Sequence, residues 1–138
     1  MTQSEFSHIA VIGAGTMGSG IAAQIANAGL PVLLLDLPAK DAGMPAPAEA
    51  AIQKLIRSDP PQLMSRDNAQ LITAGTIDGD FHKLSKCDLI IEAVIEQLPV
   101  KQALYRRLDE TVSADCVITS NTSTIPISLL VEGMPNSF

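Results

Sequence analysis

The chain alternates short runs of hydrophobic residues with longer segments in which hydrophobic positions recur every three or four residues. The short runs have the length and setting of buried strands; they lie at residues 8–12, 31–36, 87–95 and 116–120, with a weaker one near 76–77. Helical spacing occurs at residues 16–28, 48–57, 67–72 and 100–111, and a last helix is expected from Ser123 or Thr124 to Gly133. Strands that alternate with helices in this way predict an α/β fold, a doubly wound and mostly parallel sheet with helices on both faces.

Each predicted helix is expected to bury one hydrophobic stripe against this sheet. The stripe of the first helix comprises Met17, Ile21, Ile25 and Ala28. That of the second comprises Ala51, Ile52, Leu55 and Ile56. Residues 37–47 are rich in proline, glycine and alanine, and we expect an irregular surface connection there.

A glycine motif directly follows the first predicted strand and opens the first predicted helix. Residues 13–18 read GAGTMG, the spacing of the GxGxxG dinucleotide-binding motif. Gly13 permits a tight turn, Gly15 lets the backbone approach a pyrophosphate, and Gly18 lets the helix pack close to the strand. The pyrophosphate would bind free N–H groups at the positive end of the helix dipole. The residues between the glycines complete the predicted cofactor loop: Ala14, Thr16 and Met17.

The second predicted strand ends in an acidic residue, Asp36, which lies 23 positions after Gly13. Its carboxylate would accept hydrogen bonds from the adenine-ribose hydroxyls. It would repel a 2′-phosphate by about 4 kcal/mol per unit charge at about 4 Å, for an effective dielectric near 20. NAD is therefore predicted in preference to NADP. The alternative is that the glycines only form a turn and that Asp36 is a solvated strand end.

Polar residues also follow the two later strands, at the edge where ligands of doubly wound sheets bind. Glu92, Glu96 and Lys101 surround the end of the strand at 87–95, and Ala93 beside them is predicted to line the cofactor site. For Glu96 and Lys101 the alternative is a favourable charge before a helix N-terminus and a lysine that is solvated or paired with it.

The strand at 116–120 ends in five consecutive hydrogen-bonding side chains, SNTST at residues 120–124. This run would hold the nicotinamide end of a dinucleotide or the oxygen of a substrate. A turn that caps the following helix explains the same residues equally well.

Three segments together resemble the NAD-binding half of the L-3-hydroxyacyl-CoA dehydrogenases of fatty-acid β-oxidation. They are VIGAGTMGSGIA at 11–22, CDLIIEAVIEQLPVKQALY at 87–105 and SNTSTIPI at 120–127. Two more segments look most like the bacterial multifunctional members, which also carry an enoyl-CoA hydratase-like region: LITAGTIDGD at 71–80 and LLVEGMP at 129–135. The resemblance spans most of the chain, so we interpret residues 1–138 as one NAD-binding Rossmann domain.

The resemblance implies a reaction and roles for individual residues. The family oxidises (S)-3-hydroxyacyl-CoA to 3-oxoacyl-CoA with NAD⁺. Glu96 and Lys101 match positions that contact NAD, and Lys101 also matches a position near the CoA ester. Ser123 matches the serine that hydrogen-bonds the substrate oxygen, and Asn121 lies beside it. Ser123 and Asn121 are thus the candidate catalytic residues, with Ser123 also near the cofactor, and no metal site is predicted.

The general base of the resembled family has no counterpart in this sequence. In that family a His, oriented by a Glu, takes the proton from the 3-hydroxyl and lies in an HFFNP-like segment, which would come after Phe138. His8 and His82 match neither its position nor its surroundings. The helical domain that binds acyl-CoA and forms the dimer is missing too. We therefore expect an N-terminal fragment that binds NAD(H) without turnover. For the complete enzyme, the resemblance implies an acyl-CoA substrate and a homodimer.

The count of strands leads to the same expectation. A doubly wound dinucleotide-binding sheet has two βαβαβ halves, whereas five strand candidates are present here. A sixth would follow Phe138, so the sheet is predicted to be incomplete at its C-terminal edge. The strand at 116–120 would be an unprotected edge unless a partner or another copy covers it.

Composition limits the other function classes. The 138 residues, 46% hydrophobic and 17% charged, fit one globular domain, and the net charge of −6 argues against nucleic acid or an anionic membrane as partner. Residues 6–35 carry no charged side chain, but their glycines and polar residues argue against a membrane span, and no basic segment precedes them as in a signal peptide. We expect a cytoplasmic protein in which Cys87 and Cys116 are reduced, buried thiols within strands.

Two other interpretations stay open. One is a β-hydroxyacid or sugar-nucleotide dehydrogenase on the same scaffold, against which the SNTST run and the E-A-V-x-E spacing argue. The other is a free-standing module that senses NADH or docks on a partner through its exposed sheet edge.

Overall fold

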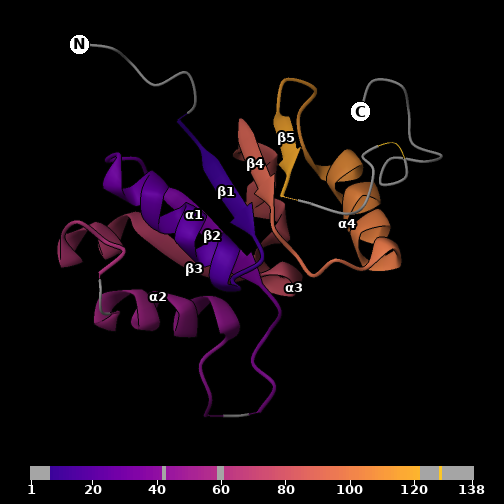
Figure 1. The fold of residues 1–138 in the computed structure, drawn as a ribbon. Helices are drawn as coiled ribbons and strands as arrows, with labels where there is room; N and C mark the ends of the chain where they lie inside the picture. Colours follow the sequence, from indigo (N-terminus) through magenta and orange to yellow (C-terminus); the bar gives the residue numbers. More distant parts are fainter. Residues whose placement is uncertain (1–6, 42, 59–60, 122–127, 129–138) are drawn as a thin grey trace.

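The computed structural model describes residues 7–41, 43–58, 61–121 and 128, and it shows an α/β fold (Figure 1). Its five strands form one sheet of order β3-β2-β1-β4-β5, in which every neighbouring pair is parallel. The strands are β1 Ile9–Ile12, β2 Val32–Asp36, β3 Ile72–Thr76, β4 Leu89–Glu92 and β5 Val117–Ser120. The predicted fold class, an open Rossmann-type sheet, is confirmed.

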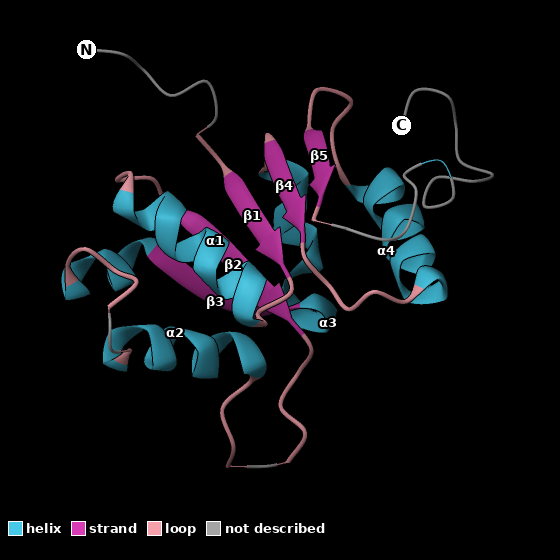
Figure 2. Ribbon diagram, viewed as in Figure 1, coloured by secondary structure: helices cyan, strands magenta, loops and turns pink. Residues whose placement is uncertain are grey.

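Helices cover both faces of this sheet (Figure 2). The helices are α1 Thr16–Asn27, α2 Pro47–Arg57, α3 Ile77–Asp80 and α4 Leu98–Thr111, with 3₁₀ helices η1 Arg66–Leu71 and η2 Phe81–Lys86. Alternate side chains of β1 pack into two hydrophobic cores, one on each face of the sheet, since successive side chains of a strand point to opposite faces. Ile9 and Val11 pack toward α1 and α2, whereas Ala10 and Ile12 pack toward α4 and η2. Full coverage explains why β1 is hydrophobic throughout.

The buried face of α1 differs from the predicted stripe. Met17 is 60% exposed, and the buried positions are the small residues Gly18, Ala22, Ala23 and Ala26. The helix packs so close to β1 that only small side chains fit between them, and the larger Ile21 and Ile25 lie partly buried at its flank. The prediction of Met17 as a core residue was therefore wrong.

The segment between α2 and β4 is the part of the fold that the hydrophobic pattern assigned least well. The predicted helix at 67–72 is the 3₁₀ helix η1, one residue earlier, and the predicted strand at 76–77 is instead the junction of β3 and α3. β3 has the sequence ITAGT, in which only Ile72 and Gly75 are buried, and it is held by parallel pairing with β2. The helix expected from Ser123 or Thr124 to Gly133 lies outside the described residues, apart from residue 128.

The strand predicted over 87–95 is shorter at both ends, because β4 spans Leu89–Glu92. Since β4 begins at Leu89 and β5 at Val117, both cysteines precede their strands; Cys87 is buried, and Cys116 is only partly buried. Both are free thiols. Burial raises the pKa of Cys87 to about 11, so this thiol stays protonated at neutral pH. Within the described ranges, none of the helices has the length and apolar character needed to cross a bilayer.

Candidate functional site

A cavity of about 710 Å³ opens at the carboxyl ends of β1, β2 and β4. It is lined by Gly13, Gly15, Thr16, Met17, Asp36, Leu37, Ile77, Ala93, Val94, Ile95, Glu96, Val100 and Asn121. The strand order reverses between β1 and β4, and ligands of open α/β sheets bind in the crevice at that point. The cavity therefore lies where the fold itself favours a ligand.

Two glycines of the GAGTMG turn are required by the fold. Gly13 has φ = +110°, a conformation that side chains other than hydrogen disfavour, and a Cβ there would overlap the Ala93 carbonyl. A Cβ on Gly18 would overlap the Gly13 carbonyl. These two residues let α1 begin directly against the ends of β1 and β4.

Gly15 is different, because a Cβ built on it would meet no protein atom within 4 Å. It lines the cavity at the N-cap of α1, and its φ of −71° is available to any residue. No side chain caps the helix, and no acidic residue lies in its first turn. The N–H groups at the positive end of α1 are thus free of side-chain competition and face a space that Gly15 leaves clear, as a bound pyrophosphate requires.

Asp36 is fixed at the end of β2 by two backbone donors. The N–H of Ala14 donates to Oδ2 and the N–H of Leu37 donates to Oδ1, each at 2.6 Å. The carboxylate thereby joins the glycine turn to the cavity wall, beside the hydrophobic side chains of Leu37 and Ile77. This arrangement fits an adenosine whose ring lies on apolar side chains and whose ribose hydroxyls meet a fixed acceptor.

The described lining of the cavity carries two carboxylates, Asp36 and Glu96, and no basic side chain. The N-terminus of α1, beside Gly15, contributes positive potential at the cavity. A dianionic 2′-phosphate beside Asp36 would therefore meet repulsion without a compensating cation.

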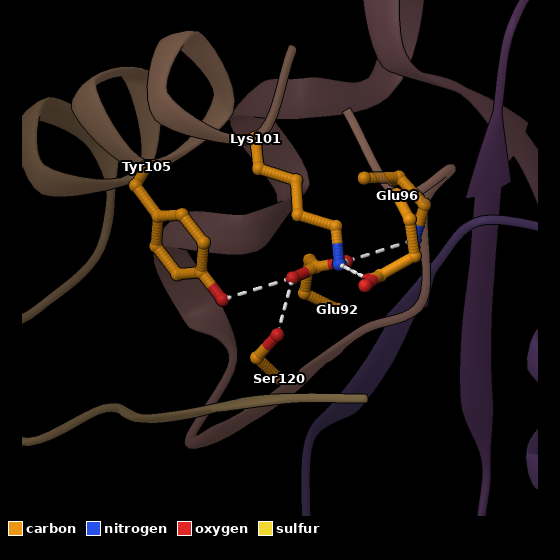
Figure 3. A network of polar contacts seen from close by, with 6 residues as sticks. Glu92, Glu96, Lys101, Tyr105 and Ser120 are labelled. Carbon is orange, nitrogen blue, oxygen red and sulfur yellow. Dashed lines mark hydrogen bonds and ion pairs between the residues drawn. The ribbon is translucent and has the colours of Figure 1, made fainter. Parts of the chain in front are cut away.

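A buried polar network lies beside the other end of the cavity (Figure 3). Lys101 of α4 is completely buried, and its Nζ contacts Glu92 Oε2 at 3.2 Å and Glu96 Oε1. Glu92, also completely buried, accepts hydrogen bonds from the Tyr105 hydroxyl at 3.1 Å and the Ser120 hydroxyl at 2.6 Å. Its Oε2 further accepts from the Val94 N–H at 2.9 Å. Burial and the neighbouring Glu92 raise the pKa of Tyr105, which keeps its hydroxyl protonated as a donor.

The structure brings most of the predicted site residues together and separates a few. Among the predicted cofactor residues, Ala14, Gly18 and Lys101 are not part of the cavity wall. Ala14 reaches the site through its N–H on Asp36, and Lys101 lies behind Glu96 rather than in solvent. Ser123 lies outside the described residues. Within the part of the chain that is described, no three His, Cys, Asp or Glu side chains gather as metal ligands.

Tyr105 was not singled out in the sequence, Ser120 was noted only as the first residue of the SNTST run, and Glu92 was noted without a role. The available signal was a charged residue closing an otherwise hydrophobic strand, LIIE, together with Lys101 and Tyr105 four positions apart on the buried face of α4.

The sheet occupies the first five positions of the Rossmann order, and its glycine turn and acidic strand end surround one cavity. Fold and site define a dinucleotide-binding domain. Residues 8–137 match the family model described as "3-hydroxyacyl-CoA dehydrogenase, NAD binding domain". The chain belongs to this family, whose cofactor is NAD.

Curated relatives agree with this assignment. The chain is 42% identical over 130 residues to a probable 3-hydroxyacyl-CoA dehydrogenase of Deinococcus radiodurans, covering 94% of the chain and 38% of the relative. It is 40% identical over 136 residues to a putative fatty acid oxidation complex trifunctional enzyme of Rickettsia felis, covering 98% of the chain and 19% of the relative. The chain thus spans less than two fifths of the length of either protein.

Solved structures show the same likeness in three dimensions. The 3-hydroxybutyryl-CoA dehydrogenase of Escherichia coli K12 matches with a TM-score of 0.79 and 32% identity, covering 97% of this chain and 28% of that one. FadB2 of M. tuberculosis matches with a TM-score of 0.80 and 33% identity, and the match covers 97% of this chain and 47% of FadB2.

Proposed function

We propose that this chain is the NAD(H)-binding part of an L-3-hydroxyacyl-CoA dehydrogenase, an enzyme that oxidises (S)-3-hydroxyacyl-CoA to the 3-oxoacyl-CoA. The observation that carries the proposal is the space left by Gly15 at an uncapped helix N-terminus, beside the fixed carboxylate of Asp36. Family membership supplies the substrate class. A cytoplasmic location stays a prediction.

Different elements of the chain would then bind different parts of the cofactor. When bound, NAD accepts the hydride that leaves the 3-carbon of the substrate. Asp36 orients the adenine ribose, the first turn of α1 holds the pyrophosphate, and the ends of β4 and β5 surround the remainder. Glu96 and Asn121 line that last region, and Asn121 together with Ser123 is proposed to direct the substrate oxygen.

We expect the chain to bind NADH and to show no steady turnover of acetoacetyl-CoA. No residue of the chain matches the family's His base, and a general base contributes about 10² to 10⁴ in rate. Loss of substrate positioning would lower the rate further. The measurement is NADH absorbance after addition of acetoacetyl-CoA at high protein concentration. Continuous oxidation of NADH would contradict this part of the proposal.

The cofactor assignment is tested by titrating NADH and NADPH against the wild-type chain, Asp36→Ala and Asp36→Asn. The wild type is expected to bind NADH at least about tenfold more tightly than NADPH, equivalent to about 1.4 kcal/mol. Asp36→Ala should lower the affinity for NADH about tenfold or more, since a hydrogen bond to a charged group contributes about 1.5–3 kcal/mol. Asp36→Asn retains an acceptor for the Ala14 N–H but loses the charge, so the preference for NADH should shrink.

The matched control is Asp41→Ala, which removes an exposed acidic residue from the connection after β2. It should bind both nucleotides as the wild type does. A wild-type chain that folds by circular dichroism but binds neither nucleotide would refute the proposed function. Equal affinity of the wild type for NADH and NADPH would refute the role given to Asp36.

A further inference from the structure

Glu92 occupies the point at which three elements around one end of the cavity meet, although it does not line the cavity itself. The first element is the loop after β4, whose Val94 N–H donates to Glu92 Oε2 at 2.9 Å. Val94 is part of the cavity wall. The position of this loop is therefore tied to a side chain that is completely buried.

The second element is α4, which Glu92 reaches through Lys101. The ammonium of Lys101 lies between Glu92 and Glu96, and Figure 3 shows these three side chains converging. Glu96 is the outermost of them, with 35% of its side chain exposed, and it lines the cavity. Glu92 thus holds the cation that in turn holds a carboxylate on the cavity wall.

The third element is the carboxyl end of β5. The Ser120 hydroxyl donates to Glu92 Oε1 at 2.6 Å, and the Asn121 N–H donates to the Glu92 carbonyl at 2.7 Å. Asn121 lines the cavity next to the β4 loop. The same buried residue therefore fixes the two strand ends relative to each other through both its side chain and its backbone.

These three elements form the end of the cavity away from Asp36. Under the proposed function, on which this inference rests, the adenylate half occupies the side of Asp36 and the glycine turn, so the β4 and β5 ends receive the nicotinamide half. We propose that Glu92 is a positioning residue for the nicotinamide half of the cofactor, acting through Lys101, Val94 and Ser120. The hydrogen bonds and the ion pair of its side chain are made to Val94, Tyr105, Ser120 and Lys101, and none is made to Asp36 or the glycine turn.

The test uses two probes on the 138-residue chain: NADH, and ADP, which carries only the adenylate half and the diphosphate. Calorimetric titrations compare the wild type with Glu92→Gln, Ser120→Ala, Lys101→Met and the double variant Glu92→Gln/Lys101→Met. Glu92→Gln keeps the shape of the side chain and leaves Lys101 paired with Glu96, so the fold should persist. Glu110→Gln is the matched control, an exposed glutamate on α4.

We expect Glu92→Gln to lower the affinity for NADH about tenfold and to leave the affinity for ADP within about twofold of the wild-type value. The reason is that the groups that Glu92 supports all lie at the nicotinamide end. Ser120→Ala should weaken NADH in the same direction by about two- to threefold. Glu110→Gln should change neither probe. A purely structural role would instead lower both affinities together, so the ratio of NADH to ADP affinity is the decisive quantity.

A double-mutant cycle shows whether Glu92 acts through Lys101. Adding Glu92→Gln to Lys101→Met should cost less NADH affinity than Glu92→Gln alone, because the cation that it holds is already gone. Wild-type NADH binding by Glu92→Gln, or parallel losses of NADH and ADP, would overturn the inference while leaving the proposed function intact. If Glu92→Gln does not fold, Ser120→Ala takes its place: an unchanged ratio of NADH affinity to ADP affinity in Ser120→Ala overturns the inference. Absence of NADH binding by the folded wild type would instead refute the proposed function.

Discussion

Gly15→Ala is expected to weaken NADH binding severely while leaving the fold intact. A Cβ at this position meets no protein atom within 4 Å, and the backbone conformation suits alanine. The methyl group would instead project into the space before the first turn of α1, where the pyrophosphate must approach the backbone. We expect the NADH affinity to fall at least about 100-fold, which corresponds to about 2.7 kcal/mol.

The glycine at position 18 supplies the matched comparison. Gly18→Ala introduces the same methyl group, but there it would overlap the Gly13 carbonyl, and a backbone atom cannot move aside without moving β1 or α1. We expect a loss of stability of about 1–3 kcal/mol or more from overpacking. Thermal unfolding followed by circular dichroism, and NADH titration on the same samples, separate the two variants. The interpretation fails if Gly15→Ala binds NADH normally or unfolds as Gly18→Ala does.

The first half of the fold was predictable because its signals are local. β1 (IAVI) and β2 (VLLLD) each contain an uninterrupted run of four hydrophobic residues, which is followed by a glycine turn in β1 and by Asp36 in β2. β3 escaped assignment because its sequence ITAGT has two buried positions of five, and pairing with β2 decides its conformation. The face of α1 was misassigned because hydrophobicity alone favours Met17, whereas close packing on β1 selects glycine and alanine.

In the candidate site, too, the residues that lie close together in the sequence were predictable, whereas those joined only by the tertiary structure were not. The glycine turn and Asp36 belong to one continuous βαβ segment, so their spacing already implies their proximity. The Glu92 network joins β4, α4 and β5 across up to 28 positions of sequence, and no local pattern pairs Ser120 with Glu92. A lysine on a hydrophobic helix face is ordinarily expected to reach solvent. That Lys101 is buried follows only from the two carboxylates that the tertiary structure places around it.

The burial of Lys101 makes Lys101→Met the substitution with the largest expected effect on stability. Removing the ammonium leaves Glu92, which is completely inaccessible to solvent, as a charge without a cation. Such a loss typically costs about 3–5 kcal/mol, a large part of the roughly 5–15 kcal/mol that stabilises an ordinary domain. The three remaining donors to Glu92, from Val94, Tyr105 and Ser120, hydrogen-bond the carboxylate but do not neutralise it.

Chemical denaturation of Lys101→Met, of Glu92→Gln/Lys101→Met and of Lys54→Met measures this effect. Lys54 is an exposed lysine in α2, so Lys54→Met should stay within about 0.5 kcal/mol of the wild type. The double variant should recover most of the lost stability, because a neutral amide at position 92 still offers acceptors to its neighbours and no buried charge remains. If Lys101→Met unfolds like the wild type, the ion pair contributes little. If the double variant is as unstable as the single one, the loss reflects packing of the lysine chain rather than its charge.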